Sequence, residues 1–212
     1  MFTGLVKCTG EIVASVPKDG GRELHVDVSG LGAEPAIGAS IALSGACQTV
    51  TACAGGVATF FATPETLRRT TLGDKRPGQF LNLEPALRLG DALDGHLVSG
   101  HVDATVAVLD ARPTGASQIW RFALPPALAP LVAEKGSVAV DGISLTVVAT
   151  EADSFTVSLI PHTLAHTTLA TTRPGEQVNL EADVLARYVA RRLVAAPRGG
   201  LSLGALQEAG FC

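Results

Sequence analysis

The chain consists of two copies of one sequence, and this internal repeat limits its fold more than any other feature. Three pairs of segments match at a single offset of 97 residues: 40–50 with 137–147, 62–72 with 159–169, and 77–84 with 174–181. In the first pair, five of eleven positions are identical. The start of each copy also matches, with a slip of one residue, at residues 3–6 and 99–102. Two copies indicate a duplicated domain rather than a solenoid.

Each copy has the pattern of a small β domain. Short runs rich in Val, Ile, Thr and Phe are separated by Gly, Pro and Asp, which is typical of antiparallel strands. We expect strands at residues 11–16, 22–28, 40–43, 47–52 and 57–62, then a short helix with Thr63 as its N-cap and Pro64 at its first position. Closure into a barrel would remove the sheet edges, while a β-sandwich has the same periodicity and stays an alternative.

The sequence after the second copy changes from a β to a helical period. Leu185, Val189 and Leu193 recur every four residues, with Asp183 as an N-cap and Pro197 as a stop. The pattern does not decide whether this helix packs on its own chain or joins subunits. We therefore divide the chain into a first barrel at residues 1–96, a second at 97–182, a helix at 183–196 and a tail at 197–212. Turn residues around 89–95 mark the boundary between the barrels.

Composition narrows the class of partner and compartment. The net charge of −4, with the basic residues spread along the chain, argues against nucleic acid. No uncharged run reaches the roughly 18 residues of a spanning helix, and no secretory leader is recognisable, so we expect no membrane partner and a cytoplasmic location. Four cysteines without a Cys-x-x-Cys pair predict reduced thiols. His162 and His166 lie four residues apart without a third ligand nearby, so we expect no metal.

Several short motifs occur in the order in which one known family carries them. They lie at residues 1–6, 47–50, 95–103, 141–147 and 160–164. Together they resemble the alpha-type riboflavin synthases, a family with a duplicated lumazine-binding domain, over nearly the full length. The resemblance implies two tandem six-stranded antiparallel Greek-key barrels, a C-terminal helix that assembles a homotrimer, and pockets shared between neighbouring subunits. Gln48 stands where relatives often carry Leu, and His162 where they can carry Glu, which affects the details of the pocket.

The resemblance also implies an activity. Members of that family dismutate two molecules of 6,7-dimethyl-8-ribityllumazine by four-carbon transfer into riboflavin and 5-amino-6-(D-ribitylamino)uracil, without a metal or redox cofactor. The sequence agrees with this, because it contains no dinucleotide-binding glycine motif, P-loop or metal-ligand spacing. Two copies of one binding domain can hold two copies of one substrate, and fixing two reactants can supply roughly 7–11 kcal/mol of barrier lowering.

The two substrates must react differently, so positions that differ between the copies are candidates for chemistry. These pairs are Leu5 and His101, Cys47 and Ser144, Ser44 and Asp141, and Glu65 and His162.

We expect His101 to transfer protons, because imidazole titrates near neutrality. Cys47 and Ser144 can position or add to C7 of the ring, or activate a water there. Asp141 is a fourth candidate that can equally be a turn residue. For His96, five residues before His101, we expect a structural role.

Substrate contacts carried over by the resemblance would come from backbone amides and hydroxyls. They are Gly4, Leu5, Val6, Cys47, Gln48, Thr49, Phe61, Ala62, Thr63, Pro64, Glu65, Thr66, Gly100, His101, Val102, Lys135, Ser144, Leu145, Thr146, Ser158, Leu159, Ile160, Pro161, His162 and Thr163. Two other functions compete with the enzyme. A non-catalytic lumazine or flavin carrier can use the same duplicated barrel, whereas a flavoprotein reductase would need a nicotinamide-binding α/β domain, and no such pattern follows the second copy.

Overall fold

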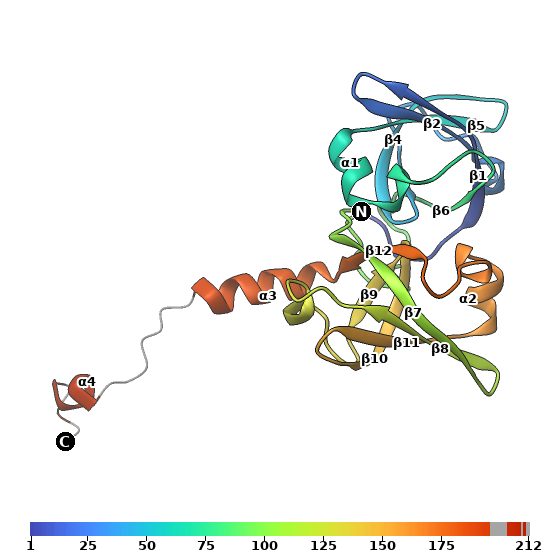
Figure 1. Cartoon of the computed structure of the whole chain (residues 1–212). Coiled ribbons are helices and arrows are strands. Elements are labelled where there is room, and N and C mark those ends of the chain that lie inside the picture. The colour runs from blue at the N-terminus through green and yellow to red at the C-terminus, as the bar shows by residue number, and fades with distance from the viewer. Residues whose placement is uncertain (196–202, 209, 211–212) are drawn as a thin grey trace.

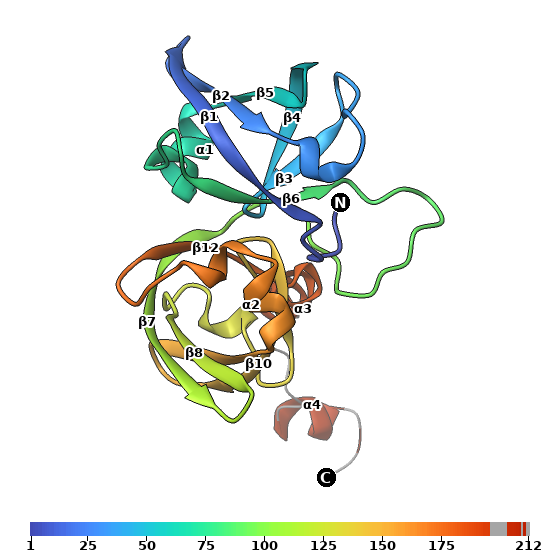
Figure 2. The same cartoon turned by 90° about the vertical axis from the view of Figure 1, so that its right-hand side faces the viewer.

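The computed structural model describes residues 1–195, 203–208 and 210, and in them the chain forms two closed antiparallel barrels (Figure 1, Figure 2). This confirms the predicted all-β fold of tandem barrels and excludes the sandwich. Barrel 1 contains β1 (Cys8–Lys18), β2 (Gly21–Asp27), β3 (Ser40–Leu43), β4 (Ala46–Ala54), β5 (Val57–Ala62) and β6 (Phe80–Pro85). Barrel 2 contains β7 (Ala104–Thr114), β8 (Ser117–Ala123), β9 (Ser137–Val140), β10 (Ile143–Thr150), β11 (Ser154–Leu159) and β12 (Gln177–Ala182). The strands follow the same order around both rings.

Alternation of side chains fills the two barrel interiors. In β5, Ala58, Phe60 and Ala62 are buried, and the residues between them are partly exposed. Phe60 lies in the same apolar core as Ile12 and Leu24. Barrel 2 has its own core, which includes the stacked rings of Phe122 and Phe155, with centroids 5.4 Å apart. Each copy therefore has a separate apolar interior.

The last strand of each barrel was not among the predicted strands, and its burial explains why. Leu81, Asn82, Leu83 and Glu84 of β6 are all buried, so this strand lacks the alternation that the other strands show. Its equivalent β12 has the same run of buried residues. These two strands lie where the barrels meet, so each has one barrel interior on one face and the other barrel on its second face. Asn82 in β6 and Asn179 in β12 form hydrogen bonds to the other barrel, which explains why these polar residues are buried.

Reciprocal hydrogen bonds hold the barrels together. Asn82 and Asn179, which are equivalent in the repeat, are each 1% exposed. The Nδ2 atom of Asn82 donates to the Asp141 carbonyl at 2.9 Å, and its Oδ1 accepts from the Thr168 amide at 2.8 Å. Asn179 makes the mirror pair with the Ser44 carbonyl at 2.7 Å and the Thr71 amide at 2.8 Å. The contact therefore has approximate twofold symmetry.

Two turns touch at the centre of this contact. Gly45 and Gly142 both have positive φ angles, of 83° and 76°. A Cβ atom on either glycine would lie 2.7 Å from the backbone nitrogen of the other. Glycine is thus required here for close approach as well as for the left-handed conformation.

Short helices follow the fifth strand in both copies. The N-cap prediction for α1 (Pro64–Arg69) is confirmed, because Thr63 Oγ1 accepts from the Thr66 amide at 3.2 Å. The counterpart in barrel 2 is α2 (Pro161–Ala165). Short 3-10 turns complete the barrels: η1 (Ser29–Leu31), η2 (Thr71–Gly73), η3 (Ala129–Leu131) and η4 (Thr168–Ala170).

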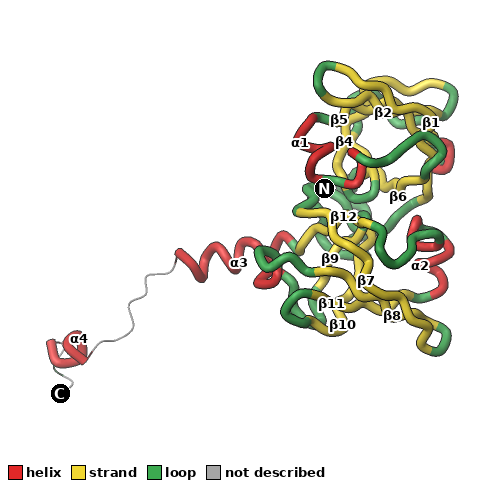
Figure 3. The backbone as a smooth tube through the Cα atoms, in the orientation of Figure 1, coloured by secondary structure: helices red, strands yellow, loops and turns green. Residues whose placement is uncertain are grey.

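The predicted C-terminal helix α3 (Val184–Ala195) projects away from both barrels (Figure 1, Figure 3). Asp183 Oδ1 accepts from the Leu185 amide at 2.9 Å, as expected of an N-cap. The apolar stripe is uncovered, since Leu185, Val189 and Leu193 are 60%, 59% and 73% exposed. This helix therefore does not pack its stripe on its own barrels. Helix α4 (Leu203–Glu208) follows α3. Pro197, the predicted stop of α3, lies outside the described residues. No helix among the described residues has the length and apolar character needed to cross a membrane.

Candidate functional site

The leading segment of each copy crosses to the barrel of the other copy. Residues 1–6 and 96–102 run antiparallel and are joined by a bridge between Phe2 and Val98, whose amides donate to each other's carbonyls at 2.8 and 3.1 Å. The Gly100 carbonyl then accepts from the Cys47 amide in barrel 1 at 2.9 Å, and the Gly4 carbonyl accepts from the Ser144 amide in barrel 2 at 2.7 Å. Each candidate site is thus built from one barrel and the leading segment of the other copy.

The glycines in these segments permit the close approach. Gly4 and Gly100 have φ angles of 78° and 81°. A Cβ atom on Gly4 would lie 2.6 Å from the Ser144 Cβ, and one on Gly100 would lie 2.6 Å from the Cys47 Cβ. Any larger residue at Gly4 or Gly100 would push the segment away from Ser144 or Cys47.

Barrel 1 has a cavity of about 250 Å³ beneath its crossing segment. Among the residues that line it, seven were predicted from the sequence: Cys47, Gln48, Glu65, Thr66, Gly100, His101 and Val102. The structure therefore brings together side chains from β4, from α1 and from the leading segment of the second copy. Cys47 is half-buried at the wall, while His101 is exposed.

Three further lining residues, Ala46, Arg69 and Thr70, were not predicted. Arg69 could have been found from the repeat, because it differs from His166 at the equivalent position. It forms an ion pair with Glu65 (Nε–Oε1 2.9 Å), and Arg68 pairs with the same carboxylate. These hydrogen bonds from Arg69 and Arg68 lower the pKa of Glu65, which keeps it ionised at the edge of the cavity.

In barrel 2, Ser144 is equivalent to Cys47. The structure places His96, for which we expected a structural role, beside this serine. His96 Nδ1 lies 2.7 Å from Ser144 Oγ. Residues 96–102 do not form a continuous strand, so the alternation that would turn His96 away does not apply. Burial lowers the pKa of His96, an effect that Asp183 and Glu181 partly oppose. A neutral imidazole therefore faces the serine hydroxyl.

Two equivalent stretches contain further predicted residues, and Lys135 and Asp141 lie apart from these stretches. Phe61 to Thr66 cover the end of β5 and the start of α1, and Ser158 to Thr163 cover the end of β11 and the start of α2. In the second stretch, the ring of His162 stacks on His166 with centroids 4.2 Å apart. Lys135 lies in an exposed turn at a φ of 63°, where its amide donates to the Val147 carbonyl.

Asp141 lies at the contact between the barrels. Its Oδ1 accepts from the Asn179 amide at 2.8 Å, as Ser44 Oγ accepts from the Asn82 amide at 3.2 Å. Burial raises the pKa of Asp141 to about 7, although the Asn179 hydrogen bond and Lys75 act in the opposite direction. The carboxyl group therefore forms its hydrogen bond within barrel 2, while the Asp141 carbonyl accepts from Asn82 across the barrel contact.

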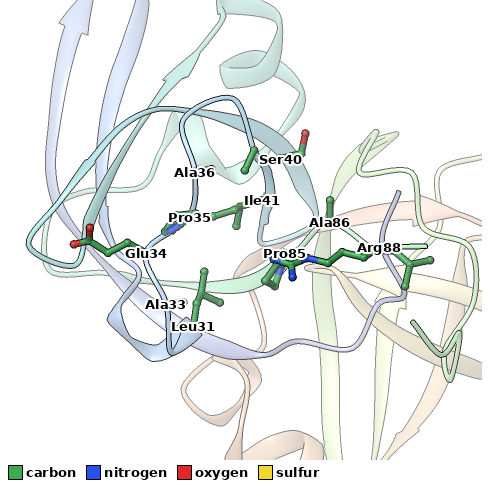
Figure 4. A pocket seen from close by; sticks show the side chains of 12 residues that line it. Leu31, Ala33, Glu34, Pro35, Ala36, Ser40, Ile41, Pro85, Ala86 and Arg88 are labelled. Carbon is green, nitrogen blue, oxygen red and sulfur yellow. The ribbon is translucent and has the colours of Figure 1, made fainter. Parts of the chain in front are cut away.

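Two larger cavities contain no residue from the predicted set. One, of about 470 Å³, lies beside β3 and the end of β6 and is mainly apolar, with Glu34 and Arg88 at its rim (Figure 4). The other, of about 480 Å³, lies between the barrels and is lined by residues that include Lys7, Phe80 and His166. Within the described residues, no group of three or more His, Cys, Asp or Glu side chains is arranged to hold a metal ion.

Comparisons with known proteins agree with this geometry. The lumazine binding domain matches the chain twice, at residues 3–86 and 99–183. The riboflavin synthase of Mycobacterium bovis is 44% identical over 202 residues, covering 90% of this chain and 97% of the relative. The enzyme of Actinobacillus pleuropneumoniae is 38% identical and is covered completely, as is this chain. The chain belongs to the riboflavin synthase family.

A solved structure shows the same fold at lower identity. LumP complexed with riboflavin superposes with a TM-score of 0.78 at 19% identity, covering 86% of this chain and 99% of LumP. The riboflavin synthase family assignment rests on the closer sequence relatives, and the likeness to LumP confirms the arrangement of the two barrels.

Proposed function

We propose that the chain converts two molecules of 6,7-dimethyl-8-ribityllumazine into riboflavin and 5-amino-6-(D-ribitylamino)uracil by moving four carbons from one to the other. One observation carries this proposal: the chain builds two related sites with unequal reactive side chains. Cys47 lies with His101 at barrel 1, and Ser144 lies with His96 at barrel 2. The shared backbone of the two sites suits two identical substrates. Their different side chains suit the donor and acceptor roles that these two substrates take. We assign the binding units to residues 1–96 and 97–182.

The volume of the barrel 1 cavity supports one substrate per barrel. At about 250 Å³ it is slightly smaller than the roughly 300–1,000 Å³ of ordinary ligand pockets, so it has no room for two bicyclic ligands. Two pockets that face each other are therefore needed. In our proposal the facing pocket belongs to a neighbouring subunit.

The side chains at each site have complementary chemistry. In barrel 1, His101 takes a proton from the 7-methyl group of the lumazine, and the Cys47 thiol contacts C7 of the ring. In barrel 2, His96 Nδ1 lies 2.7 Å from Ser144 Oγ. In our proposal the neutral ring carries its proton on Nε2, so that Nδ1 accepts a hydrogen bond from the hydroxyl and makes Ser144 a better nucleophile or a better base towards water. The two products together contain every atom of the two substrates, so we expect no metal or redox cofactor to be required.

The uncovered stripe of α3 supports an oligomer. Leu185, Val189 and Leu193 form an exposed apolar face on a helix that projects from barrel 2. We propose that three copies of this helix associate, so that barrels of neighbouring chains face each other. The free thiols of Cys8, Cys47 and Cys53 suit a reducing cytoplasm, where we expect the protein to act.

Incubation of the purified protein with 6,7-dimethyl-8-ribityllumazine tests the activity. Formation of one riboflavin for every two substrates consumed, followed by fluorescence without added metal or nucleotide, is the expected result. Stable binding without conversion would support a carrier and refute the enzyme.

The role of His101 has its own test. We expect His101→Ala to lower kcat more than it weakens lumazine binding, because the imidazole acts on a proton rather than holding the ring. Leu5→Ala at the equivalent position of the other copy is the matched control, since it removes no titratable group. Equal losses of turnover and binding in His101→Ala would show that the histidine only binds.

A further inference from the structure

Each barrel contains a buried glutamate at the same position of the repeat, and the proposed chemistry uses neither of them. Glu84 of β6 is 7% exposed and Glu181 of β12 is 4% exposed. Among the residues that the structure describes, neither carboxylate forms an ion pair. Burial of a carboxylate is costly unless hydrogen bonds satisfy it. The partners of these two groups therefore indicate what they do.

Glu181 holds the segment that ends at His101. One of its oxygens accepts from the amide and the hydroxyl of Ser99, both at 2.7 Å, and the other accepts from the Gly100 amide at 3.0 Å. The Ser99 hydroxyl in turn accepts from the His101 amide at 3.3 Å. A single carboxylate thus fixes three consecutive residues.

Glu84 makes the same bonds in the other copy. Its carboxylate accepts from the Thr3 amide at 2.6 Å, the Thr3 hydroxyl at 2.7 Å and the Gly4 amide at 3.0 Å. The Thr3 hydroxyl accepts from the Leu5 amide at 3.1 Å. Leu5 is the repeat equivalent of His101, so two identical anchors hold two different side chains.

The opposite side of each segment is held by the other barrel. Gly100 donates its amide to Glu181 in barrel 2 and accepts from the Cys47 amide in barrel 1 through its carbonyl. The peptide that leads into His101 is therefore clamped between the two barrels. Movement of the carboxylate would change the distance between the imidazole and Cys47.

We propose that Glu181 is a positioning residue for His101 at the barrel 1 site, and that Glu84 is the corresponding positioning residue for Leu5 at the barrel 2 site. This inference rests on the proposed function, because it assigns His101 a part in turnover. The hydrogen bonds explain why both positions carry a carboxylate. Three donors point at each group, and an amide in its place would offer one accepting oxygen and present N–H groups to the third donor. Glutamine at either position would therefore lose at least one of the three hydrogen bonds that hold the leading segment.

Glu181→Gln and Glu84→Gln, each made alone and together with His101→Ala, test the proposal. We expect Glu181→Gln to lower kcat about 10- to 100-fold, the scale of a misplacement of about 1 Å, with lumazine affinity changed less than about threefold. In the His101→Ala background it should change kcat less than about twofold, since the group that it positions is gone. Glu84→Gln acts at the other site, so its effect should be the same with and without His101.

NMR of the His101 ring separates failure of this proposal from failure of the proposed function. Glu181→Gln should shift and broaden the ring signals of His101, whereas Glu84→Gln should leave them unchanged. Unchanged signals in Glu181→Gln, or an equal loss of kcat with and without His101, would overturn the positioning role. His101→Ala with full turnover would instead refute the role of His101 in catalysis. If Glu181→Gln does not fold by circular dichroism, Ser99→Ala removes only the hydroxyl link and should give the same shifts at smaller size.

Discussion

Replacement of Asp141 by serine should make the protein more stable at neutral pH and leave it nearly unchanged in acid. Asp141 is 6% exposed at the barrel contact, and burial raises its pKa to about 7 from the usual 3.8. A carboxyl group with a raised pKa in the folded state binds its proton more tightly there than in the unfolded chain. Stability is therefore fully present below about pH 4, falls as the pH rises towards 7, and is constant above that value.

The size of this effect follows from the difference between the two pKa values. Each pH unit between them corresponds to about 1.4 kcal/mol, so ionisation of Asp141 costs the folded state about 4 kcal/mol by pH 8. Serine removes the charge and keeps the geometry. Ser44 occupies the equivalent turn at a φ of 44°, against 45° for Asp141, and its hydroxyl accepts the equivalent amide hydrogen bond.

Urea unfolding at pH 4, 6 and 8 measures the difference in the free energy of unfolding between Asp141→Ser and the wild type. We expect this difference to grow by about 4 kcal/mol from pH 4 to pH 8. Ser44→Asp is the mirror control, because it places a new carboxyl group at a site that is 1% exposed and should introduce the same kind of pH dependence. A constant difference between Asp141→Ser and the wild type across this range would refute the reasoning.

Three other substitutions test the barrel contact, the crossing segments and the helix. Asn179→Ala leaves two buried backbone groups without partners, at about 1–3 kcal/mol each, so urea unfolding should show a loss of about 2–6 kcal/mol. A loss below about 1 kcal/mol would contradict the role of these hydrogen bonds in holding the barrels together. Gly100→Ala places a Cβ atom 2.6 Å from the Cβ atom of Cys47, at a residue with a φ of 81°. Riboflavin formation should therefore fall at least about tenfold, and near-normal turnover would argue against close packing of residues 96–102 on barrel 1. Val189→Asp puts a charge on the exposed stripe of α3. It should convert the proposed oligomer into monomers in analytical ultracentrifugation, while an unchanged sedimentation coefficient would exclude this helix as the interface.

Much of the fold could be predicted because its signals are local. The period of two in residues 57–62 reflects a strand with one face in a core, and the N-cap at Thr63 is a contact between neighbours in sequence. The repeat showed that both halves share one fold. The pattern of strands did not predict the sixth strand, because Asn82 contacts the other barrel and Glu84 contacts the leading segment, and no local pattern contains these contacts.

The crossing of the leading segments also depends on contacts between residues far apart in the sequence, which no local pattern contains. The repeat aligns Gly4 with Gly100, but it says nothing about which barrel each segment touches. The sequence placed His101 and Cys47 among the candidates because they differ between the copies, and the structure brings them to one cavity. Glu181 is identical between the copies, so a search for differences passed over it. Residues that build the site symmetrically are invisible to that search.

Comparison of the copies also passes over His96. This residue precedes Ser99, where the matched part of the second copy begins. Its ring nonetheless reaches Ser144, while His101, five residues later, reaches the cavity beside Cys47. One segment thus supplies a histidine to each site, and it can do so because it bridges Phe2 on the axis between the barrels. The asymmetry of the two sites therefore has two sources. One is this connection, in which a single stretch of chain serves both barrels, and the other is the difference between Cys47 and Ser144 within the barrels.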